Sequence, residues 1–82
     1  MEYNISTLNR IPLNTDCKIE KLNCDGIIKR RLLDLGFVKN TTVTPVLLSP
    51  SKGVKAFWIR NTLIAIRDED SNLILVIFNL LH

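Results

Sequence analysis

The sequence predicts a small, mainly β domain, built as a barrel of about five short strands with one short α-helix after the first strand. Two observations lead to this fold class. Apolar residues recur at helical spacing as far as Gly36, and after Phe37 the pattern changes to the alternation that is typical of strands. The 82 residues suffice for a modest core, so we expect residues 1–82 to form a single domain.

Before the helix, we expect one helical turn and one strand. The segment from Thr7 to Ile11 suits a single helical turn, because its two apolar residues are three apart and Pro12 follows. The first strand is predicted from Cys17 to Leu22, where apolar and charged residues alternate imperfectly.

The end of the predicted helix is the most informative part of the chain. Ile28, Leu32 and Leu35 share one face, at spacings of four and three. Gly36 can adopt the left-handed conformation that closes a helix, and Phe37 can then fold back onto the apolar face. We expect this face to close the barrel.

Four further strands are predicted, at residues 41–48, 54–60, 63–67 and 73–78. Pro45 indicates an edge strand or a bulge, because proline cannot donate to a ladder. Asn61 tolerates a positive φ and so suits a tight hairpin. Residues 68–72 are expected to form a solvated acidic turn. The apolar segment 73–81 could complete the barrel or offer an edge to a second copy, so a monomer and a weak homo-oligomer both stay open.

Charge and hydropathy exclude several classes of function. The formal net charge of +3 is mild and the basic residues are spread along the chain, which does not indicate nucleic-acid binding. The longest apolar run, Leu73 to Phe78, is far shorter than the roughly 20 residues needed to cross a bilayer. The N-terminus lacks the pattern of a secretion signal. We therefore expect a cytoplasmic protein that does not insert into a membrane.

The sequence offers no constellation typical of an enzyme. The single histidine, His82, is the last residue, so a histidine-based acid–base pair is not expected. The spacing of Cys17 and Cys24 is not that of a zinc knuckle. We expect Cys17 to be a small buried hydrophobe and Cys24 to be more exposed. These observations predict no enzyme activity and no cofactor, with weak Fe²⁺ or Zn²⁺ binding as an open alternative.

Two short motifs, Arg31 to Phe37 (RLLDLGF) and Leu63 to Arg67 (LIAIR), are specific when taken together. With their spacing, they resemble the FeoA family, small cytoplasmic SH3-like barrels that accompany the ferrous-iron membrane transporter FeoB. The resemblance covers about residues 8–76. Asn40 and Asn61 stand where the family often has glycine, and asparagine suits a positive φ. Residues 52–54 depart from the family's common Gly-Asp-Pro.

The resemblance implies a non-enzymatic accessory or regulatory role in bacterial ferrous iron uptake, by protein–protein interaction with the cytoplasmic GTPase part of an FeoB-like transporter. Charge and apolar character place the expected contact surface on the helix and on residues 49–55. The expected basic contacts are Lys29, Arg30 and Lys52, and the expected apolar contacts are Val38, Pro50 and Phe57.

Three points stay open at this level. Phe57 and Trp58 face opposite sides of their strand, and the pattern does not decide which ring is exposed. Arg31 could pair with Asp34 on the helix and Arg67 could brace the barrel, and for both arginines we favour a structural role over docking. Similar barrels occur as C-terminal domains of metal-dependent transcriptional repressors, so a stand-alone interaction domain of that kind and a metal-ion sensor remain alternatives.

Overall fold

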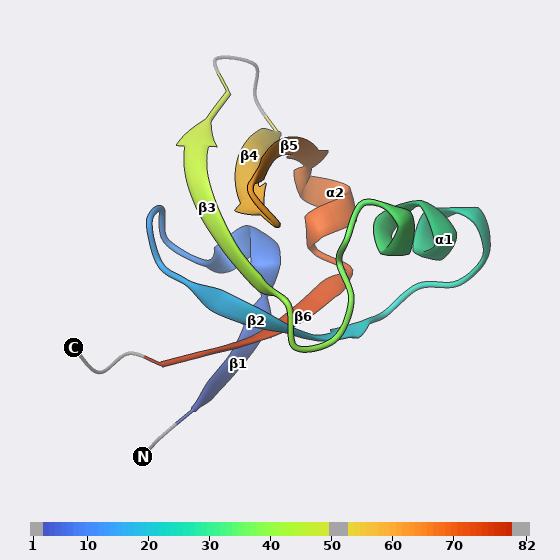
Figure 1. Cartoon of the computed structure of the whole chain (residues 1–82), viewed down its shortest axis with the longest axis horizontal. Helices are drawn as coiled ribbons and strands as arrows, with labels where there is room; N and C mark the ends of the chain where they lie inside the picture. Colours follow the sequence, from blue (N-terminus) through green and yellow to red (C-terminus); the bar gives the residue numbers. More distant parts are fainter. Residues whose placement is uncertain (1–2, 50–52, 80–82) are drawn as a thin grey trace.

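The computed structural model describes residues 3–49 and 53–79, whose strands form one antiparallel sheet that curls into a barrel (Figure 1). The strand order is β1-β6-β2-β3-β4-β5. The elements in chain order are β1 (Asn4–Thr7), the 3-10 helix η1 (Leu8–Arg10), β2 (Cys17–Leu22), α1 (Gly26–Asp34), β3 (Thr42–Leu48), β4 (Val54–Ile59), β5 (Thr62–Arg67), α2 (Asp68–Ser71) and β6 (Ile74–Phe78).

The predicted β-barrel with a helix after a strand is confirmed, and two elements were missed. The described sheet has six strands rather than about five, because β1 precedes the predicted helical turn and pairs with β6. The segment expected to be an acidic turn forms α2, a single helical turn. Both elements are four residues long, too short for hydrophobic periodicity to reveal.

The described part of the apolar C-terminal segment, which contains β6, lies inside the sheet and does not form an edge, while residues 80–81 lie outside the described residues. β6 lies between β1 and β2, with Ile77 opposite Ile5 and Val76 opposite Ile19. The two ends of the sheet are therefore β1 and β5.

Irregular positions in the strands agree with their residue types. Pro45 adjoins the register shift between β3 and β4, which confirms the predicted bulge. Arg60 and Asn61, with φ values of 51° and 61°, form a two-residue loop between β4 and β5. Asn40 has a φ of 72°, so both asparagines adopt the positive φ expected of them.

Helix α1 ends as predicted. Gly36 has a φ of 107°, its N–H donates to the carbonyl of Leu33, and the N–H of Phe37 donates to the carbonyl of Leu32. These two bonds define a Schellman motif. Phe37 is 0% exposed, so this ring anchors the end of the helix in the core.

The core is formed by apolar side chains from both halves of the sheet, from η1 and from the α1 segment. The buried apolar residues are Leu8, Ile11, Cys17, Ile19, Leu22, Leu32, Phe37, Val43, Phe57, Ile59, Ile66, Ile74 and Val76.

Most of helix α1 lies outside this core, at one side of the barrel (Figure 1). Leu32 is the one residue of α1 that is buried. Ile28 and Leu35, expected on the same buried face, are 43% and 36% exposed. The expectation that this whole face closes the barrel is therefore wrong for these two residues, because a gap separates them from the sheet.

Candidate protein-interaction site

The gap is a cleft of about 470 Å³ between α1 on one side and β5 with α2 on the other. We call it the α1–β5 cleft. Its lining residues are Ile28, Arg31 and Leu32 from α1, Leu35 at the C-cap of that helix, Ala65, Ile66 and Arg67 from β5, and Glu69 and Asp70 from α2.

The cleft combines an apolar floor with a charged rim. Leu32 and Ile66 are 3% and 6% exposed, so they form its deepest part. Arg31 and Arg67 are both exposed on the rim. A mixed surface of this kind suits a peptide or protein ligand better than a small polar substrate.

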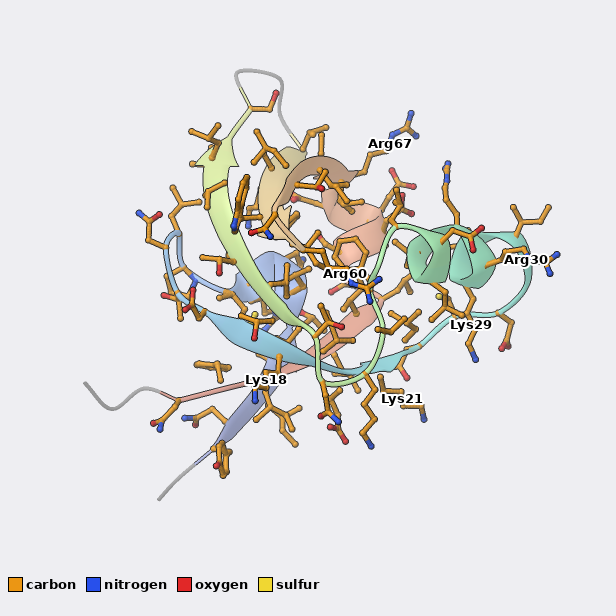
Figure 2. All side chains as sticks on the ribbon, viewed as in Figure 1. Lys18, Lys21, Lys29, Arg30, Arg60 and Arg67 are labelled. Carbon is orange, nitrogen blue, oxygen red and sulfur yellow. The ribbon has the colours of Figure 1, made fainter. Side chains whose placement is uncertain are left out.

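The rim arginines do not have the structural roles expected of them. Across residues 3–49 and 53–79, the one ion pair joins Lys39 Nζ to Glu20 Oε2 at 3.9 Å. The predicted pair between Arg31 and Asp34 is therefore not formed. Arg67 points away from the end of β5 rather than bracing the barrel (Figure 2). Both guanidinium groups are available to a ligand.

Two predicted contact residues, Lys29 and Arg30, are exposed on α1 and point outward from it (Figure 2). Val38 is half-buried in the turn that follows the helix. Pro50 and Lys52 lie outside the described residues.

The prediction that Phe57 contacts a partner is wrong, because Phe57 is 0% exposed. Its place opposite Pro45 and Ile64 puts its ring on the inner face of the sheet. Trp58 is the exposed aromatic, at 46%, and it lies opposite Leu63, which is 50% exposed. The alternation could not decide between the rings, because apolar residues occupy both faces of this strand.

The cysteines behave as their positions suggested. Cys17 is buried and donates its thiol to the carbonyl of Val43 at 3.3 Å, while Cys24 is half-buried. Burial, with a smaller contribution from Asp16, raises the pKa of the Cys17 thiol to about 12. Such a thiol stays neutral near pH 7 and is a poor metal ligand.

In the part of the chain that the structure describes, no three His, Cys, Asp or Glu side chains form a group that could hold a metal ion. No helix in that part is long and apolar enough to span a membrane.

These features define a small SH3-like β-barrel domain with a cleft between its inserted helix and the last strand of the sheet. The FeoA domain family matches residues 6–77. The chain therefore belongs to the FeoA family, and the resemblance read from the two motifs is confirmed. None of the curated proteins matches the chain.

Solved structures give the same picture. The FeoA protein of Stenotrophomonas maltophilia, solved in complex with zinc and described as a procaryotic SH3 domain protein and candidate ferrous iron transport activating factor, is 31% identical over 85% of this chain and 87% of that one, with a TM-score of 0.74. A FeoA-like protein from Clostridium acetobutylicum is 22% identical over 100% of this chain and 94% of that one, with a TM-score of 0.85.

A manganese-dependent transcriptional repressor is also similar in structure, with a TM-score of 0.82. It is 10% identical to this chain, and the match covers 96% of this chain and 44% of the repressor. At that identity the similarity concerns the fold alone.

The two family motifs face each other across the α1–β5 cleft, which the sequence did not indicate. The helix motif supplies Arg31, Leu32 and Leu35, and the strand motif supplies the β5 side of the cleft. The sequence offered one hint of the cleft: the helix motif begins with Arg31 and the strand motif ends with Arg67, each beside apolar residues. Spacing along the chain, however, does not give the distance between two elements in space.

Proposed function

We propose that this chain is a non-enzymatic accessory protein of bacterial ferrous iron uptake, which acts in the cytoplasm by binding the GTPase part of an FeoB-like transporter. The observation that carries the proposal is the meeting of the two family motifs at the α1–β5 cleft.

The proposed contact surface consists of the cleft and the outer side of α1. Ile27 is 87% exposed and Leu33 is 40% exposed, so the helix presents apolar side chains to solvent on more than one side. Exposed apolar groups grouped on one element are typical of binding surfaces. The surface therefore offers apolar contact area besides the cleft itself.

Basic residues on α1 would guide the encounter. Lys29 and Arg30 are exposed beside the apolar groups, and neither has an ion-pair partner among the described residues. Positive charge at the rim of an interface mainly raises the association rate with an acidic partner. Val38 would add apolar contact at the end of the helix. Pro50 and Lys52 remain predicted contacts from the sequence alone.

A binding measurement with the transporter's soluble GTPase portion tests the proposal. We expect the purified chain to bind it, and reversal of both charges (Lys29→Glu with Arg30→Glu) to weaken binding at least about tenfold, since each charge contact contributes on the order of 1 kcal/mol. The matched control reverses Lys18 and Lys21, which are exposed on β2 and give the same change in net charge.

Isothermal titration calorimetry distinguishes the outcomes. If both double variants weaken binding equally, the effect is one of net charge and the proposed surface is wrong. If the unaltered chain does not bind, the proposed function itself is wrong. We further propose that the protein acts without a bound cofactor.

A further inference from the structure

Strand β5 has a free edge that opens into the α1–β5 cleft. It is the last strand in the sheet order, and within residues 3–49 and 53–79 it pairs with β4 alone. An edge strand presents unpaired N–H and C=O groups, and folded proteins usually blunt or cover such edges. Here α1 forms the wall of the cleft opposite the β5 edge, and the cleft between them is open.

The register shows which backbone groups face the cleft. Ile59 and Thr62 flank the two-residue hairpin loop, and in such hairpins the flanking pair exchanges both backbone hydrogen bonds. Alternate residues then turn their N–H and C=O groups away from β4. On β5 these are Leu63, Ala65 and Arg67.

In the described part of the chain, no turn or loop hydrogen bond uses the N–H groups of these three residues. The C=O of Arg67, the N-cap of α2, accepts the first bond of that helix, so the free outward groups are the three N–H groups and the C=O groups of Leu63 and Ala65. Two of the three, Ala65 and Arg67, also line the cleft. Ala65 is exposed and has a small side chain, so another backbone can come close to it. The free backbone groups of Ala65 and Arg67 therefore lie at the α1–β5 cleft.

We propose that the cleft binds an extended segment of the partner as an added strand on the free edge of β5. In this mode the main chain supplies hydrogen bonds and alternate side chains enter pockets. The segment has apolar side chains at alternate positions, which lie against Ile28, Leu32 and Leu35 of the opposite wall. The rim has mixed charge, with Arg31 and Arg67 beside Glu69 and Asp70, so a carboxylate of the segment would pair with an arginine guanidinium at a position away from the two acidic side chains.

This inference rests on the proposed function, which makes the transporter's GTPase portion the source of the segment. A second copy of this chain is the other candidate occupant. Helix α1 opposes it, because β5 of a second barrel carries its own α1 beside the same edge. The two helices would meet before the edges do, whereas a single extended segment has no such wall.

Amide hydrogen exchange, measured residue by residue by NMR on the whole chain, is the direct test. In the free protein, we expect the amides of Leu63, Ala65 and Arg67 to exchange faster than those of Ile64 and Ile66. On addition of the GTPase portion, the three outward amides should become protected at least about tenfold, since each gains a hydrogen bond. The amides of β1, the other edge strand, serve as the control and should not change.

Substitutions at Ala65 distinguish the contribution of its backbone N–H to binding from that of its side chain. Ala65→Pro removes the outward N–H without removing a bond to β4, as proline is tolerated at such edge positions. We expect it to weaken binding at least about tenfold, while Ala65→Thr, which keeps the donor, weakens it less than about threefold. Circular dichroism of both variants confirms that the fold is kept.

A second probe makes the edge testable without the transporter. It is a nine-residue synthetic peptide of alternating valine and threonine with one central aspartate. We expect it to shift the NMR signals of the three outward amides and of the α1 methyl groups, and the double variant Arg31→Glu with Arg67→Glu to abolish those shifts.

The outcomes separate the two proposals. If the GTPase portion binds but the outward amides stay unprotected and Ala65→Pro binds normally, strand addition is wrong and the proposed function stands. If the GTPase portion does not bind, the proposed function fails, and the peptide decides whether the edge accepts a strand. Self-association of the chain that Ala65→Pro abolishes would instead assign the edge to a second copy and overturn the inference.

Discussion

Replacing Leu32 by alanine is expected to lower the free energy of unfolding by about 2–3 kcal/mol. Leu32 is 3% exposed, so nearly the whole side chain is removed from water on folding. It is also the one buried residue of α1. Truncating its side chain therefore removes apolar contacts and also weakens the attachment of the helix to the barrel.

The magnitude follows from the position of Leu32 at the floor of the cleft. Leucine-to-alanine changes in closed cores cost about 2–5 kcal/mol, and the upper part of that range comes from the empty cavity left behind. A space beside an open cleft can fill with water or with neighbouring side chains, so the lower part of the range applies. For a domain of this size, about 1 kcal/mol changes Tm by roughly 4–8 °C, so we expect Tm to fall by roughly 10–20 °C.

Two further alanine variants on the same helix serve as controls. Leu33 is 40% exposed and Ile27 is 87% exposed, so we expect losses of about 1 kcal/mol and about zero for these two residues. Thermal unfolding followed by circular dichroism and by Trp58 fluorescence gives all three values. Equal losses in Leu32→Ala and Leu33→Ala would refute the reasoning, because the effect would then reflect helix propensity rather than burial.

The remaining predictions concern the thiols and the metal. Because the pKa of Cys17 is raised from 9.0 to about 12, unfolding releases its proton between those values, and stability falls as pH rises. Relative to Cys17→Ala, the unaltered chain should lose on the order of 1 kcal/mol of stability between pH 7 and pH 10 in urea denaturation. An equal pH dependence in both proteins would contradict the burial of this thiol. Calorimetric titration with Fe²⁺ or Zn²⁺ should show no stoichiometric binding, whereas a saturating one-to-one isotherm would favour the metal-sensor alternative.

Local signals in the sequence were sufficient wherever the backbone conformation depends on one residue type. Gly36 and Phe37 predicted the end of α1, since only glycine adopts a φ of 107° easily and an apolar residue next to it can return to the core. Pro45 predicted a bulge and Asn61 a hairpin, for equally local reasons. These are properties of a few consecutive residues, so they can be derived without the tertiary structure.

Predictions failed where the outcome depends on the distance between elements. The helical spacing of Ile28, Leu32 and Leu35 correctly placed them on one face, but it did not show that only Leu32 reaches the core. In the same way, alternation placed Phe57 and Trp58 on opposite faces without identifying the inner one. The cleft belongs to this class of feature, because it is a gap between two segments about 30 residues apart in the chain.

The weak attachment of α1 is itself an argument for its role. A helix of nine residues that begins at a glycine has marginal stability in isolation, because its few hydrogen bonds barely compensate for the free-energy cost of helix nucleation. Its attachment to the barrel consists mainly of Leu32 and of the turn that leads to Phe37. Ile27 and Leu33 contribute little to that attachment, and as exposed apolar groups they raise the risk of aggregation. A polar residue at Ile27 would preserve the fold at almost no cost in stability, and one at Leu33 at a cost of about 1 kcal/mol, so the proposed contact with another molecule would account for the apolar side chain at Ile27 above all.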